Sequence, residues 1–152
     1  MTAGEADSRR HATASGRPVE PRDVVENALR SLVAQDAALF MRWFHEDVVY
    51  EAPPQPRITG RFRYFQEIAA VLTPGTGARA SGFNISRVDP GGQPVRWIQT
   101  SLRFEVPNDG SMFPTEETKY ATQESEVWFG VQGDKIVEVK AFSKPHSWHF
   151  SA

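Results

Sequence analysis

The most regular alternation of hydrophobic and polar residues lies in the last third of the chain. Two long alternating runs flank Gly133-Asp134, and glycine at the first of two loop positions is typical of a type II′ β-hairpin. The pattern predicts strands over about 117–131 and 135–143. With a two-residue loop, Gln132 pairs with Lys135 and pairing continues outward from there.

This register decides which side chains share a face of the hairpin. It places Glu126 opposite Ala141, Trp128 opposite Val139 and Glu124 opposite Ser143. Because successive side chains alternate, one face carries Tyr120, Thr122, Glu124, Glu126 and Trp128. Apolar partners suggest that this face lines a pocket. In the alternative, both glutamates face solvent and the core receives Val127, Phe129 and Val131.

Helical periodicity dominates the first half of the chain. Apolar residues recur at helical spacing from Val25 to Val33, and Asp23 with Glu26 resembles a capping box. Asp36 is expected to cap a second, short helix. A short strand at 47–52 ends at a proline-rich break, because proline cannot donate to a strand ladder. A third helix is expected between Phe62 and Leu72.

Further alternating runs at about 81–89 and 94–106 complete four expected antiparallel strands. Helices followed by a strand meander predict an α+β fold, with N-terminal helices on one face of a curved antiparallel sheet. The curved sheet and the helices together are expected to form a cone that encloses one cavity. The expected organisation is a disordered tail at 1–21, one domain at 22–146 and a C-terminal tail at 147–152.

Composition narrows the range of functions. The 152 residues are 39% hydrophobic and 11% aromatic, with a formal net charge of -2 and no cysteine. The charge disfavours a nucleic-acid partner, and no apolar run approaches the length that spans a membrane. The absence of cysteine fits a cytoplasmic protein and excludes thiol chemistry. The histidines suggest no metal site, so no cofactor is expected.

One stretch gives the chain a family resemblance. Residues 43–50 read WFHEDVVY and precede a proline-rich break and Ile58-Thr59-Gly60, while the last hairpin contains GDKIVE. Together these motifs resemble the nuclear transport factor 2-like (NTF2-like) superfamily over most of residues 23–145. Within it, residues 124–145 are similar to the phenazine-biosynthesis A/B type, near the SnoaL-like cyclases. The resemblance implies a cone-shaped fold and a homodimer through the outer sheet face.

Known functional positions of the superfamily are replaced in this sequence. The catalytic aspartate of ketosteroid isomerase falls on Ala52 and its tyrosine on Ala28. The phenazine-type histidine falls on Phe83 and the last-strand glutamate on Ala141. None of these roles is carried over, because one fold supports many chemistries.

Catalysis is instead expected from the polar hairpin face. A carboxylate at Glu126 in an apolar cone would be a usable general acid or base, tuned by Glu124. Tyr120 or Tyr50 could donate hydrogen bonds to a developing oxyanion. The expected substrate-binding residues are Trp128, Phe83, Arg87, Val139 and Ala141.

These features predict a cofactor-independent cyclase or isomerase of secondary metabolism, acting by proton transfer on a polyketide-like or aromatic small molecule. One alternative is a binding or carrier protein without chemistry. A third hypothesis is a dimeric interaction module with a filled cone. Epoxide hydrolysis is a further alternative, because two carboxylates could position and activate a water.

Overall fold

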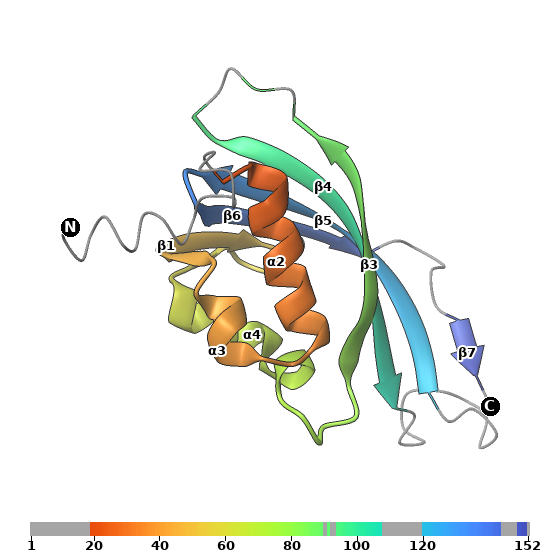
Figure 1. The fold of residues 1–152 in the computed structure, drawn as a ribbon. Coiled ribbons are helices and arrows are strands. Elements are labelled where there is room, and N and C mark those ends of the chain that lie inside the picture. The colour runs from red at the N-terminus through yellow and green to blue at the C-terminus, as the bar shows by residue number, and fades with distance from the viewer. Residues whose placement is uncertain (1–18, 90, 92–93, 108–119, 144–148, 152) are drawn as a thin grey trace.

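The computed structural model describes residues 19–89, 91, 94–107, 120–143 and 149–151. Three helices pack against one face of a curved sheet (Figure 1). They are α2 (Pro21–Val33), α3 (Ala37–Met41) and α4 (Arg61–Leu72). Within the described residues, no helix is long and apolar enough to cross a membrane.

The starts of the first two helices test the predicted caps. Asp36 caps α3, because its carboxylate accepts a hydrogen bond from the Leu39 N–H at 3.1 Å, as predicted. The capping box at Asp23 is wrong: Glu20 is the N-cap of α2, without a side-chain cap, and Pro21 opens the helix. Asp23 lies in the first turn, where its negative charge interacts favourably with the positive end of the helix dipole.

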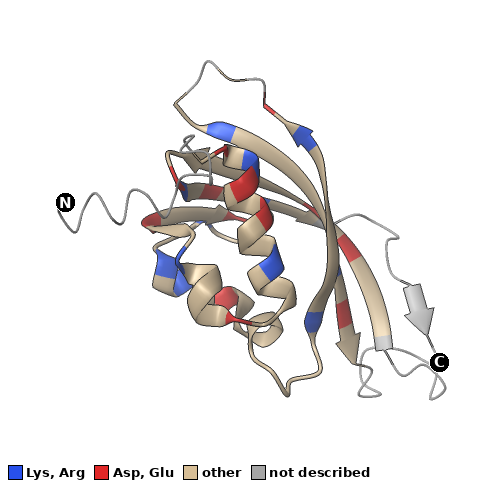
Figure 2. Cartoon of the chain, in the orientation of Figure 1, with Lys and Arg blue, Asp and Glu red and all other residues tan. Residues whose placement is uncertain are grey.

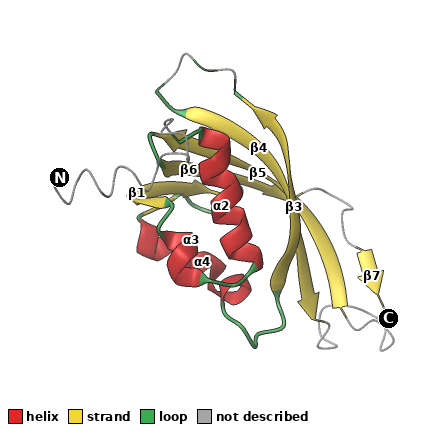
Figure 3. Cartoon of the chain, viewed as in Figure 1, coloured by secondary structure: helices red, strands yellow, loops and turns green. Residues whose placement is uncertain are grey.

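The described strands form one mixed sheet in the order β2-β1-β6-β5-β4-β3, with β7 on β5 (Figure 3). Strand β1 runs parallel to β6, and the other pairs are antiparallel. The predicted α+β class is confirmed. The strands are β1 (Phe44–Glu51), β2 (Ile58–Thr59), β3 (Arg79–Val88), β4 (Arg96–Pro107), β5 (Tyr120–Gln132), β6 (Lys135–Ser143) and β7 (His149–Ser151).

The last hairpin has the predicted turn but a different register. Gln132 pairs with Lys135, and Gly133 has a φ of 64°, as a type II′ turn requires. A β-bulge then skips Val137, so Gly130 pairs with Glu138. Glu126 consequently pairs with Phe142, and the predicted pairing with Ala141 is wrong. One extra residue in a strand is enough to shift all later pairs.

The bulge reverses the predicted faces of the hairpin. Val127, Phe129 and Val131 are buried in the core, so the intervening Glu126 and Trp128 lie on the outer face, away from the helices. This is the arrangement that the sequence left as the alternative. Ile136 also points inward, whereas Phe142, Glu138 and Lys140 belong to the outer face.

A second bulge corrects the position of Arg87. Strand β3 skips Ser86 between the pairs Ile85–Thr100 and Arg87–Gln99. Phe83 pairs with the buried Leu102, on the helix side. Arg87 therefore does not share a face with Phe83 and lies beside Gln99 on the outer face.

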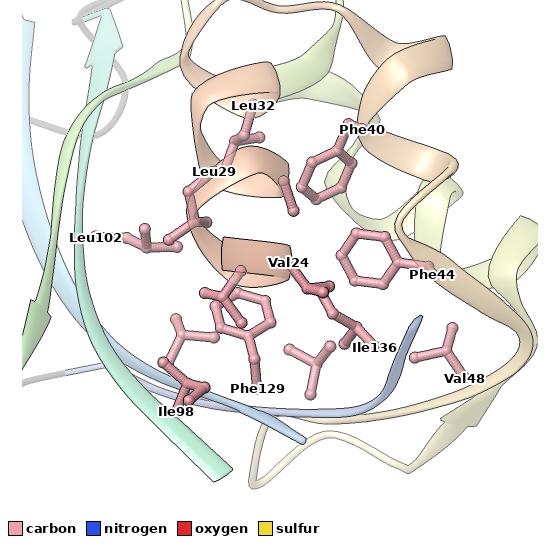
Figure 4. Close-up of a cluster of buried hydrophobic side chains, with 14 of the residues drawn as sticks. Val24, Leu29, Leu32, Phe40, Phe44, Val48, Ile98, Leu102, Phe129 and Ile136 are labelled. Atoms are coloured by element: carbon pink, nitrogen blue, oxygen red, sulfur yellow. The ribbon is translucent and has the colours of Figure 1, made fainter. Parts of the chain in front are cut away.

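The core lies between the helices and the inner face of the sheet (Figure 4). Each fully buried aliphatic or aromatic side chain contributes about 1.5–3 kcal/mol. Aromatic rings fill the end of the core near α3, where Phe40 and Phe44 have centroids 4.7 Å apart. The labelled members are Val24, Leu29, Leu32, Phe40, Phe44, Val48, Ile98, Leu102, Phe129 and Ile136.

Candidate active site

A cavity of about 400 Å³ lies beside this core, between the helices and the inner sheet face. This volume is within the range of small-molecule sites. Most of its wall is apolar, so a ligand would leave water on binding. The lining residues are Leu32, Phe40, Tyr50, Ala52, Pro53, Pro54, Gln55, Tyr64, Ile68, Val71, Leu102, Phe104, Ser125, Val127, Phe129, Val139 and Ala141.

Two tyrosines supply hydroxyl groups to this cavity. Tyr50 comes from β1, where it pairs with Val139. Tyr64 comes from α4, whose cavity face continues at helical spacing through Ile68 and Val71. The two tyrosine rings have centroids 4.9 Å apart, and Tyr64 also packs on Phe44 at 5.1 Å. The pair is therefore held by ring packing, not by hydrogen bonds.

Burial keeps both phenols protonated. Desolvation raises the pKa of Tyr64 well above its ordinary value, and the neighbouring Tyr50 raises it further. Desolvation also raises the pKa of Tyr50, with a smaller contribution from the Glu67 carboxylate. Near neutral pH both hydroxyls are therefore hydrogen-bond donors. Within the described part of the chain, neither hydroxyl has a hydrogen-bond partner.

Charged groups are excluded from the described wall of the cavity. Figure 2 shows acidic and basic residues distributed over helices and strands, and none of the described lining residues is among them. Glu67 is exposed and lies between the cavity residues Tyr64 and Ile68 in sequence. Its charge acts on Tyr50. Among the described residues, no group of acidic and histidine side chains could hold a metal ion.

Three of the predicted site residues line the cavity: Tyr50, Val139 and Ala141. Two predicted catalytic residues do not. On the outer face, Glu126 accepts hydrogen bonds from the Gln99 amide at 2.7 Å and the Trp128 indole at 3.1 Å. Glu124 lies 3.7 Å from the Arg103 guanidinium. The expected placement of both glutamates in the cavity is therefore wrong.

Trp128, Arg87 and Phe83 are also outside the described cavity wall. Trp128 and Arg87 lie on the outer face, as described above. Phe83 packs against the core and borders a small surface depression beside Arg103 and Glu124. Tyr120 opens β5 opposite Pro107, and its side chain lies outside the described residues.

Sequence reasoning missed Tyr64 and Ser125. The spacing of Tyr64, Ile68 and Val71 marks one helix face, but an ordinary buried tyrosine has the same spacing. Ser125 was assigned to the face opposite the pocket, because the predicted register placed Glu124 and Glu126 inside. The alternative with Val127, Phe129 and Val131 in the core places Ser125 inside, because side chains alternate along a strand.

Comparisons with known proteins support the fold. Neither the protein-family models nor the curated proteins contain a match to this chain. Among solved structures, a ketosteroid isomerase-like protein from Erwinia carotovora atroseptica is similar with a TM-score of 0.63 and 11% identity, over 82% of this chain and 94% of that chain. An NTF2-like protein from Anabaena variabilis has a TM-score of 0.57 and 18% identity, over 83% and 90%.

A computationally designed 17-OHP binder is also similar, with a TM-score of 0.59 and 14% identity, over 84% of this chain and 95% of the designed one. At these identities the likeness shows the fold. The chain has the fold of the NTF2-like superfamily, as its sequence resemblance predicted.

Proposed function

We propose that this chain binds a small, largely apolar carbonyl compound in its cavity and promotes isomerisation or cyclisation through an enolate. The observation that carries the proposal is the pair of protonated phenols, Tyr50 and Tyr64, which share an apolar cavity and lack described hydrogen-bond partners. A ligand carbonyl would satisfy these donors. The superfamily resemblance to isomerases and SnoaL-like cyclases is consistent with this chemistry.

The tyrosines would act on the oxygen of the reacting group. When a proton leaves the carbon beside a carbonyl, the C–H electron pair moves into the enolate and negative charge develops on the oxygen. Fixed O–H donors in a site without water stabilise that charge more strongly than they do in bulk solvent. The raised pKa values of Tyr50 and Tyr64 ensure that both donors retain their protons.

Glu67 is the proposed proton acceptor. It lies on α4 next to two cavity residues, Tyr64 and Ile68, and its charge acts on Tyr50. With a β,γ-unsaturated ketone, its carboxylate would take the α-proton and return it to the γ-carbon of the resulting dienolate, which moves the double bond and completes an isomerisation. In a cyclisation, the enolate carbon would instead attack a second carbonyl of the substrate, and the alkoxide that forms would take the proton back from Glu67.

The proposal is tested by hydrogen exchange at the α-carbons of phenylcyclohexanone in D2O, followed by NMR. Tyr64→Phe is expected to slow the enzyme-dependent exchange by about 10²–10³-fold, the usual contribution of a single oxyanion donor. Trp128→Phe, on the outer face, is the control and should exchange at the wild-type rate. Equal exchange in Tyr64→Phe and the wild type would refute the role of the tyrosines.

A second candidate function is binding without turnover. It is favoured by the described cavity wall, which contains neither a carboxylate nor an imidazole. The same experiment separates the two functions: saturable ligand binding with exchange at the buffer rate would establish a carrier. The two carboxylates expected to activate a water for epoxide hydrolysis, Glu124 and Glu126, lie outside the cavity. This activity is therefore not proposed.

We also propose a homodimer through the outer sheet face. Phe142 is 42% exposed there, next to Glu126 and near Lys140, whose ammonium lies 5.1 Å from the Trp97 ring centroid. Aromatic residues at the centre with polar groups around them are typical of such interfaces.

Phe142→Lys is therefore expected to convert the dimer to a monomer in sedimentation experiments, because it places a cation in the centre of the interface. Phe62→Lys is the matched control, because Phe62 is an exposed phenylalanine on α4, away from the sheet. A Phe142→Lys variant that sediments like the wild-type dimer would refute this interface.

A further inference from the structure

Ser125 is an exception among the buried hydroxyl side chains. Three buried polar side chains are found in the described residues: Ser31, Thr100 and Ser125. The Ser31 hydroxyl donates to the Asn27 carbonyl at 2.9 Å, and the Thr100 hydroxyl donates to the Val127 carbonyl at 2.8 Å. Within the described residues the Ser125 hydroxyl has no such partner, and its oxygen is not fully enclosed by protein atoms.

Buried polar groups are almost always hydrogen-bonded, because an unmade bond costs about 1–3 kcal/mol. Ser125 is only 8% exposed and lines the cavity. Its neighbours on the inner face are Leu102, opposite on β4, and Val127, two residues along β5. A serine in this apolar wall has its remaining hydrogen-bonding capacity directed to whatever occupies the cavity.

The position of Ser125 along β5 separates it from the row that contains Tyr50. Tyr50 lies in one cross-strand row with Val139 and Phe129. Ser125 lies four residues from Phe129 along β5, roughly 13 Å at the usual rise of a strand. The serine and the tyrosine pair therefore mark separate polar points of the cavity, with apolar wall between them.

We infer that Ser125 is a specificity-determining residue, and that the ligand is a neutral, elongated molecule with a second oxygen function far from its carbonyl. The carbonyl binds Tyr50 and Tyr64, the apolar body contacts the wall, and a distal hydroxyl binds Ser125. The ligand is neutral because the described wall offers no counter-charge, and an unpaired buried charge is very costly. This inference rests on the proposed binding of a carbonyl compound by the tyrosines.

The test compares two ketones that differ by one hydroxyl: phenylcyclohexanone and its para-hydroxyphenyl analogue. Their dissociation constants are measured by calorimetry for the wild type, Ser125→Ala and Ser101→Ala. The wild type is expected to bind the hydroxylated ketone about fivefold more tightly, as one neutral hydrogen bond predicts. Ser125→Ala should lose that preference while its affinity for phenylcyclohexanone stays the same.

Ser101→Ala is the matched control, because Ser101 pairs with Glu126 on the outer face. It should keep the wild-type preference. Equal weakening of both ketones by Ser125→Ala would show a packing effect only and would overturn the inference. So would a wild type that binds both ketones equally, even if Tyr64→Phe weakens both and the proposed function stands. Failure of the wild type to bind either ketone would overturn the proposed function, and this inference with it.

Discussion

Glu67→Gln is expected to slow the α-proton exchange of a bound ketone by about 10²–10⁴-fold, the usual contribution of a general base. The amide keeps the size of the side chain but cannot accept the proton. Because the amide keeps the size and the polarity of the side chain, ligand affinity should remain close to that of the wild type. Exchange and binding are measured on the same ketone, by NMR and by calorimetry.

Glu126→Gln is the informative comparison for this experiment. Both changes remove one carboxylate, but Glu126 lies on the outer face and accepts hydrogen bonds from Gln99 and Trp128. Its loss should leave the exchange rate unchanged. If Glu126→Gln stopped exchange and Glu67→Gln did not, the assignment of the proton acceptor would be wrong.

The contrast between these two glutamates shows what the sequence could and could not predict. Turn chemistry is local, so Gly133 identified the hairpin and its first pair correctly. The bulge at Val137 has no comparable local signal, because no glycine or other turn residue marks it in the sequence of β6. The pairing of Glu126 with Phe142 follows from that bulge.

The candidate site could also be predicted only in part. Strand alternation placed Tyr50 on one face with Val48 and Ala52, the resemblance implied that this face is inward, and the structure has Val48 buried and Ala52 in the cavity wall. Tyr64 required knowledge that α4 turns its tyrosine toward β1, which helical periodicity alone does not give. The parallel pairing of β1 with β6 joins segments about ninety residues apart, and no local pattern in either strand indicates that partner.

The largest loss of stability is expected from Phe44→Ala, at about 3–5 kcal/mol. Phe44 is fully buried and packs its ring against Phe40 at 4.7 Å and Tyr64 at 5.1 Å. Its removal leaves a cavity where the first helices meet the start of β1. Urea unfolding followed by circular dichroism measures the free energy of unfolding. Phe62→Ala removes the same ring from a position that is 72% exposed, and should change that free energy by less than about 0.5 kcal/mol.

The same substitution connects the core to the site. Tyr64 owes its position to ring contacts with Phe44, Phe40 and Tyr50, so the loss of the Phe44 ring removes support from one oxyanion donor. Phe44→Leu fills most of the space without a ring. It should therefore slow ketone exchange severalfold while it changes the free energy of unfolding less than Phe44→Ala does. An equal loss of exchange in Ile98→Val, a buried change on β4 outside the ring cluster and the described cavity wall, would instead show that exchange simply follows global stability.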